Sequence, residues 1–563
     1  MTAWGWRRAV LCGCLLGCSQ REPADLILHR GRIYPFAIDS APAEAVAVRS
    51  GRIVYVGRNS GVTAYRGRET RIVDLGGRVV LPGLHDTHVH PRGGIHLSEC
   101  PLDGLDTRAE VLDSVRRCAA AQPGKPWIRG RGWQLPLFPA ANPRREWLDS
   151  AVPDRPVYLV AADGHSAWVN SKALAAAGVT RRTPDPPNGR IERSPDGEPS
   201  GTLRESAMAL VDRHVPPWTA QEIRDGLAQG LALANKVGVT TVHEASASPA
   251  LLAGYAALDS ADQLTARVIA AIYVDPLGGL AQVDSLRAWR GRYGGRGRFR
   301  ATAAKIFADG VIEAGTAALL TPYVGGTSRG TLNLTRTAMD SLVTALDAAG
   351  FQVHVHAIGD GAVRQTLDAL AAARRVNGPR DARPIIAHLQ LIHPDDLPRF
   401  ARLGVIPSFQ MLWAQEDQYI TELTVPVLGP ERSARLYPIG SLARAGARLA
   451  AGSDWSVTSI NPFEAMQVAI TRRSVEDALP GDPWLPDERI DLATALRAYT
   501  FNGAWAAFDE ATNGTLEIGK AADLIVLDQD PHRIPPVRLH RIRVLLTVVD
   551  GREMWRDPSL AVP

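Results

Sequence analysis

Eight apolar, β-rich runs constrain the fold of this chain more than any other feature of its sequence. Runs such as VTTVHEA and RVIAAIYV are continuously apolar, as parallel strands buried on both faces are. Stretches with helical periodicity, such as MDSLVTALDAAG, separate most of them. The expected strands cover residues 79–88, 239–244, 267–273, 302–307, 352–356, 385–388, 405–409 and 448–453. Eight successive β/α units predict an α/β fold of the (β/α)8, TIM-like barrel type.

The chain has 563 residues, more than a single barrel needs. Residues 24–80 and 512–557 both show short alternating strands with turns, so we expect one small β-sandwich domain formed from both termini. The barrel is assigned to residues 81–511. Within it, the segment of about 95–235 follows the first barrel strand and is too long for a loop. It predicts a subdomain inserted over the barrel mouth.

The composition is that of an ordinary globular protein, with 45% hydrophobic and 22% charged residues and a formal net charge of +4. No basic run with interleaved aromatic residues is present, which argues against a nucleic-acid partner. We therefore expect a small-molecule substrate, and the sequence leaves open whether the chain forms a homodimer. Nearly all of the positive charge is arginine, because only five lysines occur.

The N-terminus indicates export. Arg7 and Arg8 precede a short apolar run that ends at Leu15-Leu16-Gly17-Cys18. Residues 1–17 are typical of a lipoprotein signal peptide, with Cys18 as the acylated residue. We predict an exported protein whose only membrane contact is this lipid anchor, in the periplasm or at the outer membrane. A plain signal peptide, or chance cysteines, is the alternative.

Two further cysteines, Cys100 and Cys118, lie in the expected insertion. They could form a disulfide in an oxidising compartment or remain two thiols, because their spacing in the sequence does not fix their geometry.

Polar residues stand at the C-terminal ends of five expected strands, where barrel active sites form. They are His88 and His90, Lys305, His354 and His356, His388, and Asp454. Alternate side chains of a strand point the same way, so the two histidines of a His-x-His pair can bind one metal ion. Each residue alone is more typical of a buried, hydrogen-bonded polar group. Their coincidence at one end of the barrel predicts a metal site.

The same residues and their surroundings resemble the amidohydrolase superfamily. The order His-x-His, Lys, His, His, Asp on strands one, four, five, six and eight is its pattern. The amidohydrolase-3 (YtcJ-like) branch is similar over essentially the whole mature chain. The matching strings are DGHSAWVNSKAL, KIFADGVIEAGTAAL, HVHAIGDGAV, LGVIPSFQ, GSDWSV and GTLEIGKAADLIVLD.

The resemblance implies a site with one or two divalent metal ions, zinc being the expected metal. His88 and His90 would hold the first ion beside Asp454, and His356 and His388 the second. Lys305, carboxylated by carbon dioxide, would bridge them, because a free ammonium cannot coordinate a cation. A lysine salt-bridged to Asp309 is the alternative. His354 would neighbour the ligands.

The implied activity is hydrolysis of a carbon–nitrogen, amide-type bond other than a peptide bond. A metal-activated water would attack the carbonyl, with Asp454 as general acid and base. Two alternatives remain open: hydrolysis of an ester or cyclic amide at a mononuclear site, and a non-catalytic, lipid-anchored protein that binds a metal or ligand.

The sequence departs from its relatives beside the expected site. Leu389 and Ala387 flank His388, where relatives often carry a polar neighbour, and Trp413 stands where many have a histidine. An indole binds no metal, so Trp413 predicts a more apolar or aromatic substrate side. His165 and Trp168, in the insertion, are further candidates for substrate binding. Trp133, Asn170 and His243 could also line the pocket.

Overall fold

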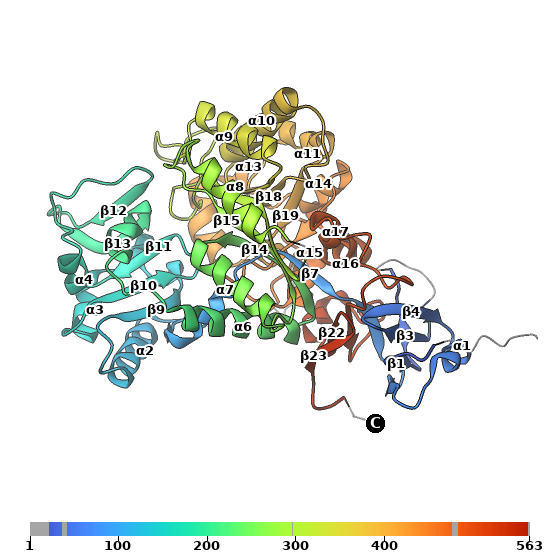
Figure 1. The fold of residues 1–563 in the computed structure, drawn as a ribbon. Coiled ribbons are helices and arrows are strands. Elements are labelled where there is room, and N and C mark those ends of the chain that lie inside the picture. The colour runs from blue at the N-terminus through green and yellow to red at the C-terminus, as the bar shows by residue number, and fades with distance from the viewer. Residues whose placement is uncertain (1–21, 37–41, 296, 476–481, 561–563) are drawn as a thin grey trace, which may run out of the picture.

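The computed structural model describes residues 22–36, 42–295, 297–475 and 482–560. The predicted signal peptide and Cys18 lie outside these ranges. Three parts are visible in Figure 1: a central barrel, an inserted domain on one side, and a domain in which the two ends of the chain meet. Among the described helices, none is long and apolar enough to cross a membrane.

The barrel is one sheet of eight parallel strands, in the order β20-β19-β18-β17-β16-β15-β14-β7. The strands are β7 (Leu84–Val89), β14 (Val239–Ala247), β15 (Arg267–Tyr273), β16 (Phe299–Phe307), β17 (Gln352–Ala357), β18 (Ile385–His388), β19 (Ile406–Phe409) and β20 (Ala450–Ala451). The sheet nearly closes, because the Thr87 hydroxyl donates to Ala451 O at 2.9 Å and the Asp454 N–H donates to His88 O at 2.7 Å. The predicted barrel is therefore confirmed.

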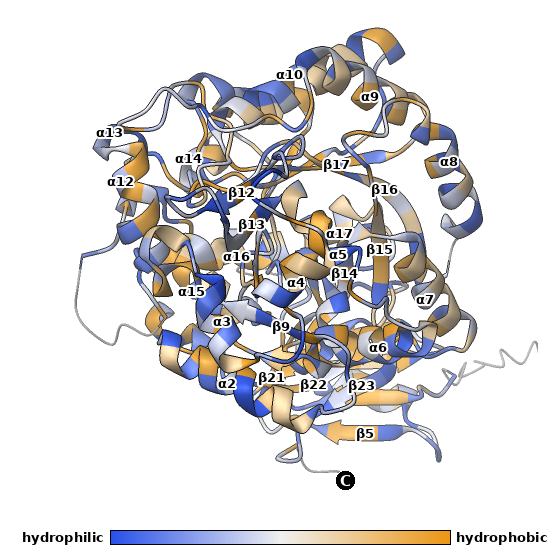
Figure 2. Cartoon of the chain, turned by 90° about the vertical axis from the view of Figure 1, so that its left-hand side faces the viewer, coloured by the Kyte–Doolittle hydropathy of each residue, from blue (hydrophilic) through white to orange (hydrophobic). Residues whose placement is uncertain are grey.

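Helices cover the outside of the barrel and bury one side each. In α9, Met339, Leu342, Val343 and Leu346 are buried at helical spacing, and Thr335 caps the first turn. Figure 2 shows helices such as α2 and α9 with both hydrophobic and hydrophilic residues. The covering helices are α6 (Ala220–Lys236), α7 (Pro249–Ser260), α8 (Gln282–Tyr293), α9 (Arg336–Ala348), α10 (Asp360–Asn377), α11 (Leu397–Leu403), α14 (Ile439–Arg444), α15 (Pro462–Thr471), α16 (Leu492–Tyr499) and α17 (Phe501–Ala506).

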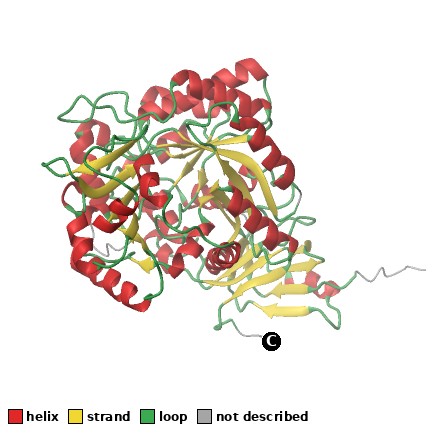
Figure 3. Cartoon of the chain, turned by 60° about the vertical axis from the view of Figure 1, so that its left-hand side comes forward, coloured by secondary structure: helices red, strands yellow, loops and turns green. Residues whose placement is uncertain are grey.

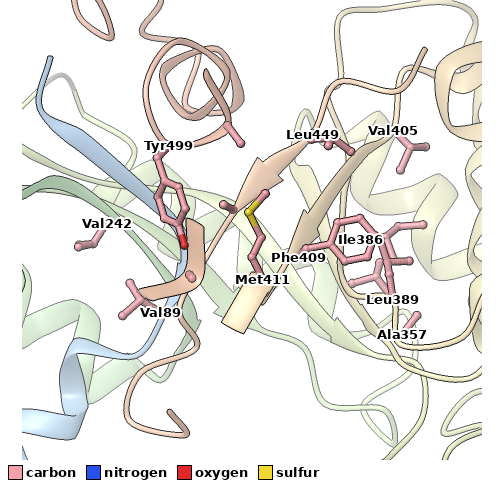
Figure 4. Packing of buried hydrophobic residues seen from close by; sticks show 14 of the residues in the cluster. Val89, Val242, Ala357, Ile386, Leu389, Val405, Phe409, Met411, Leu449 and Tyr499 are labelled. Carbon is pink, nitrogen blue, oxygen red and sulfur yellow. The ribbon is translucent and has the colours of Figure 1, made fainter. Parts of the chain in front are cut away.

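The barrel core is continuous from strands to helices. Figure 4 shows buried side chains of this cluster, with Ile386 and Phe409 from neighbouring strands close together. Strands β14 and β17 are buried along their whole length, so their polar residues are held in place by packing on both faces. This rigidity matters because the site residues lie at the ends of these strands.

The expected first strand, residues 79–88, is two strands in two different sheets. β6 (Val79–Pro82) pairs with β21 (Leu524–Leu527) of the terminal domain, and β7 enters the barrel. Gly83 separates them, and a Cβ at this position would lie 2.4 Å from the Thr240 hydroxyl oxygen. The apolar run continues through the glycine, so its hydrophobicity alone did not reveal the change of sheet.

The terminal domain consists of two sheets, visible at the lower right of Figure 3. One has the order β4-β3-β1-β5 and the other β2-β6-β21-β22-β23. They share a core that includes Leu28, Val46, Leu524 and Leu546. The strands are β1 (Leu26–His29), β2 (Arg32–Ile33), β3 (Ala45–Arg49), β4 (Arg52–Gly57), β5 (Arg71–Asp74), β21 (Leu524–Leu527), β22 (Val544–Val549) and β23 (Arg552–Arg556). Both ends of the chain thus build one β-sandwich, as predicted.

The inserted domain is a six-stranded sheet in the order β12-β13-β11-β10-β9-β8. Its strands are β8 (Cys100–Pro101), β9 (Ile128–Trp133), β10 (Val157–Ala161), β11 (Ser166–Val169), β12 (Gly189–Arg193) and β13 (Pro199–Glu205), with α2 (Arg108–Ala121), α3 (Arg145–Ala151) and α4 (Ser171–Ala176). A disulfide joins Cys100 to Cys118 and so ties β8 to α2. The predicted insertion of about 95–235 also includes most of α6, which packs on α7 of the barrel.

Candidate metal centre

A cavity of about 710 Å³ lies between the barrel mouth and the inserted domain. Residues at or just after the C-terminal ends of the barrel strands line it, together with residues of the insertion. The predicted site residues on its wall are His88, His90, His165, Lys305, His356, His388, Trp413 and Asp454. The sequence thus located the cavity, although the role of each residue stays a prediction.

Asp454 lies at the centre of the cluster. Its Oδ1 is 3.1 Å from His90 Nε2 and 3.5 Å from His88 Nε2, and its Oδ2 is 3.9 Å from His388 Nδ1. His88, His388 and Asp454 each offer a ligand atom within 4.8 Å of the others. Asp454 Oδ1 and His388 Nδ1 are buried and have no hydrogen-bond partner among the residues that the structure describes. Buried polar atoms without partners cost free energy. Imidazole and carboxylate are zinc ligands, so this donor set fits a divalent cation.

The histidines of this cluster favour the neutral form that a ligand needs. Burial lowers the pKa of His88 and His388 well below its usual value, and the charge of Lys305 adds to the effect. Protonation would remove the lone pair through which imidazole binds a metal.

Lys305 is completely buried, and its Nζ lies 3.5 Å from His88 Nε2 and 4.6 Å from the centre of the Phe307 ring. Burial lowers the pKa of Lys305 to about 7, against the opposing charge of Asp454. The alternative partner, Asp309, is occupied elsewhere: its carboxylate accepts the N–H groups of Ala318, Ile358 and Gly359. Near neutral pH, much of the Lys305 amine is therefore uncharged, the form that reacts with carbon dioxide.

His356 has one ring nitrogen engaged and the other available. Its Nε2 lies 3.1 Å from Gly310 O, which can only accept, so Nε2 carries the hydrogen and Nδ1 keeps a lone pair. The ring centres of His356 and His388 are 4.4 Å apart. Among the described residues, the group of ligand atoms that lie within 4.8 Å of one another contains His388 but not His356.

His165 reaches this cluster from the inserted domain. Its ring centre lies 5.2 Å from that of His356, and its Nδ1 is 2.9 Å from Glu205 Oε2. Burial opposes the charging of His165, but the carboxylate of Glu205 outweighs it and raises the pKa to about 9. A protonated His165 would be a hydrogen-bond donor rather than a metal ligand.

A second layer of residues orients the first, and one of its members was missed in the sequence. His88 Nδ1 contacts His354 Nε2 at 2.9 Å, which agrees with the neighbouring role expected for His354. His90 Nδ1 lies 3.2 Å from Glu244 Oε1, while Tyr255 donates to Glu244 Oε2 at 3.0 Å. Glu244 ends the string VTTVHE on the second barrel strand, so a search of strand ends for carboxylates would have found it.

The two tryptophans proposed for substrate binding have different environments. Trp413 lines the cavity and stacks on His388, with ring centres 5.5 Å apart and planes 9° apart, and its Nε1 donates to Thr458 Oγ1. Trp168 is fully buried in the core of the inserted domain beside Trp133 and Phe138, and its Nε1 donates to Arg144 O. Trp168 therefore has a packing role, contrary to our expectation.

The remaining candidates also serve the structure. Trp133 donates to Leu159 O inside the inserted domain, Asn170 caps α4, and His243 is buried in the barrel. Of the candidates for substrate binding, His165 and Trp413 thus line the cavity, whereas Trp133, Trp168, Asn170 and His243 do not.

Comparison with known proteins identifies relatives over nearly the whole chain. The model of the amidohydrolase family matches residues 71–554. The protein LONG AFTER FAR-RED 3 of Arabidopsis thaliana is 32% identical, covering 90% of this chain and 87% of its own. An N-substituted formamide deformylase of Arthrobacter pascens is 28% identical, covering 94% and 97%. The crystal structure of an uncharacterised metal-dependent hydrolase from Pyrococcus furiosus superposes with a TM-score of 0.68 at 27% identity, covering 90% and 99%.

Proposed function

The chain belongs to the amidohydrolase family, and from this premise we propose that it hydrolyses a carbon–nitrogen, amide-type bond of a small molecule. The observation that carries the proposal is the buried cluster of His88, His388 and Asp454, in which two ligand atoms have no hydrogen-bond partner among the described residues. The name of the Arthrobacter pascens relative, an N-substituted formamide deformylase, favours small acyl amides as the substrate class.

His88, His90 and Asp454 would hold a first divalent ion, and His356 and His388 a second, with carboxylated Lys305 between them. When bound, such ions supply Lewis acidity toward the water and the carbonyl oxygen. Zinc is the metal we propose, because imidazole and carboxylate ligands suit it. His88, His388 and Asp454 could also hold a single ion. Metal content per chain therefore separates the binuclear from the mononuclear form.

Asp454 would move the proton. Its Oδ1 lies 3.5 Å from His88 Nε2 and 3.1 Å from His90 Nε2 and has no hydrogen bond within the described part of the chain, so it could accept a proton from the attacking water. The water oxygen bonds to the carbonyl carbon, the carbon–nitrogen bond breaks, and Asp454 returns the proton to the leaving nitrogen. His165 can donate a hydrogen bond from the opposite wall, and Trp413 closes the cavity beside His388.

The test is a hydrolysis screen of zinc-loaded protein with N-formyl, N-acyl-amino-acid and aryl-amide compounds, with the release of free amine as the readout. We expect turnover of at least one amide, and loss of that turnover in Asp454→Asn. Glu431→Gln, on an exposed helix, is the matched control. Cleavage of the corresponding esters alone would favour the alternative reaction. Failure of the zinc-loaded protein to cleave any compound would favour the alternative of a non-catalytic protein that binds a metal or ligand.

We also propose that the protein is exported and lipid-anchored through Cys18. The disulfide between Cys100 and Cys118 supports this, because disulfides persist in oxidising compartments. In cell fractionation, Cys18→Ala should leave the membrane fraction or stay unprocessed, whereas Cys118→Ala should not. Unchanged fractionation of Cys18→Ala would contradict the anchor.

A further inference from the structure

The cavity contains positive charge that the proposed reaction does not use. Arg131, on β9 of the inserted domain, and Arg92, in the 3-10 helix Pro91–Ser98 that follows β7, both line it. The Nε of Arg131 is buried and has no hydrogen-bond partner among the described residues. Arg92 donates from one nitrogen to Ser246 O. A guanidinium has five N–H donors, so both side chains have donors left for a ligand.

Of the acidic groups near Arg131, Glu99 and Glu205 face other partners, whereas Asp103 and Asp212 place negative charge beside it. Glu99 is 3.0 Å from His96 Nδ1, and Glu205 accepts from Thr316 and faces His165. Burial lowers the pKa of Arg131, Glu99 opposes this effect, and the neighbouring charge of Arg92 reinforces it. Two cations in one buried place repel each other, and an anion bound beside them would relieve this cost.

The guanidinium of Arg131 lies beside the part of the insertion that reaches the metal cluster. A Cβ on Gly164 would be 3.9 Å from Arg131 Nη1, and the next residue, His165, contacts His356. The cation is therefore on the same wall as the loop above the strand ends. A ligand bound by Arg131 could therefore place a second functional group beside the cluster of His88, His388 and Asp454.

We propose that the substrate carries a carboxylate and that Arg131, with Arg92 beside it, binds this group. The proposal rests on amide hydrolysis as the proposed function and narrows its substrate class. A guanidinium binds a carboxylate through two parallel N–H···O bonds, which fix orientation as well as position. Tyr273, Leu277 and Trp413 also line the cavity and suit an apolar body between the two polar ends. An apolar amino acid that is acylated on its amino group and keeps its free carboxylate has this form.

The experiment compares two substrates that differ only in this charge: N-formylphenylalanine and N-formylphenylalaninamide, each as both enantiomers. With zinc-loaded, full-length protein we expect kcat/KM to be about ten- to a hundredfold higher for the carboxylate, the range of a hydrogen bond to a charged group. In Arg131→Met this ratio should fall to near one. In the control Arg129→Met the ratio should persist, because Arg129, also on β9, lies over the Trp218 ring and is not among the residues that line this cavity.

Equal kcat/KM for the two substrates, or a ratio that survives in Arg131→Met, would overturn the proposal. If neither is cleaved, calorimetric binding of N-acetylphenylalanine and its carboxamide decides the question. Preferential binding of the carboxylate that Arg131→Met abolishes would support the carboxylate site while counting against the hydrolysis, and equal or absent binding would refute the site. Should Arg131→Met fail to fold, Arg131→Lys and Arg92→Met are expected to reduce the ratio severalfold.

Discussion

The two ends of the barrel treat their charged residues in opposite ways. At the N-terminal end, Arg267 on β15 pairs with Asp523 at 2.9 Å, and Arg300 on β16 pairs with Asp509 at 2.6 Å. At the C-terminal end, Asp454 and His388 have buried atoms without a hydrogen-bond partner in the described ranges of the chain. One end of the barrel sheet thus carries satisfied ion pairs on β15 and β16, and the other end carries buried, unpaired atoms on β18 and just after β20.

This difference separates stability from function within one sheet. Paired charges at the N-terminal end join the barrel to the chain that follows α17 and to the terminal domain. These ion pairs stabilise the folded state. The unpaired groups at the other end cost free energy in the isolated protein, and a bound cation would recover it. Changes at the two ends should therefore affect different measurements.

The largest effect is expected from removing two imidazoles of the proposed first ion. His88→Ala with His90→Ala should abolish bound zinc and nearly all turnover, while the fold is largely kept. Metal analysis, turnover and circular dichroism measure this. His393→Ala, a histidine away from the cavity wall, is the control. A double variant with full metal content and full turnover would contradict the proposed metal site at the C-terminal end of the barrel.

Lys305→Ala should come next, with loss of most turnover because the proposed bridge disappears. Short carboxylic acids such as formate or acetate should restore part of it, since they supply the missing carboxylate. Lys236→Ala, whose ammonium lies near Trp555, should be unaffected. Failure of every acid to rescue, together with one metal ion per wild-type chain, would favour the mononuclear site.

Glu244→Gln sharpens the comparison because it changes a residue that contacts the proposed ligand His90 and is not itself a proposed ligand. Glu244 contacts His90 and Tyr255, so its loss should leave the ligands present but less well oriented. We expect zinc affinity to fall about 10- to 100-fold. Competition with a chelator measures this, and the exposed Glu431→Gln is again the control. Unchanged affinity would show that the contact does not position His90.

The smallest effect on activity is expected at the opposite end of the barrel. Asp509→Asn leaves Arg300 without its carboxylate and should lower the free energy of unfolding by about 1–3 kcal/mol. Zinc content and kcat of the folded fraction should match the wild type. Denaturant titration with parallel kinetics tests this. A loss of turnover without a loss of stability would mean that the two ends are coupled.

The sequence predicted the barrel and the positions of its strands, because continuous apolar runs with polar ends are a direct consequence of burial on both faces. It also located the wall residues on these strands. It did not separate Trp413, which lines the cavity, from Trp168, which is packed in the inserted domain, because an indole suits both places. Nor could it pair Cys100 with Cys118, since that depends on how the insertion folds.

Glu244 shows a different limit. Its position at the end of a predicted strand can be read from the sequence, but its contact with His90, which follows the neighbouring strand, cannot. The division of residues 79–88 between two sheets likewise depends on what lies beside Gly83, namely Thr240.

The pairing of β6 with β21 has a consequence for the order in which the chain can mature. About 440 residues separate the two strands, and a ribosome adds roughly 5–20 residues per second, so the first strands wait on the order of tens of seconds for their partner. Until then β6 offers an open edge of hydrogen-bonding groups to any other chain. The N-terminal segment can therefore complete its sheet only after the last forty residues have been made. Shortening the C-terminus should expose the N-terminal segment, at the opposite end of the polypeptide, to proteases and to aggregation.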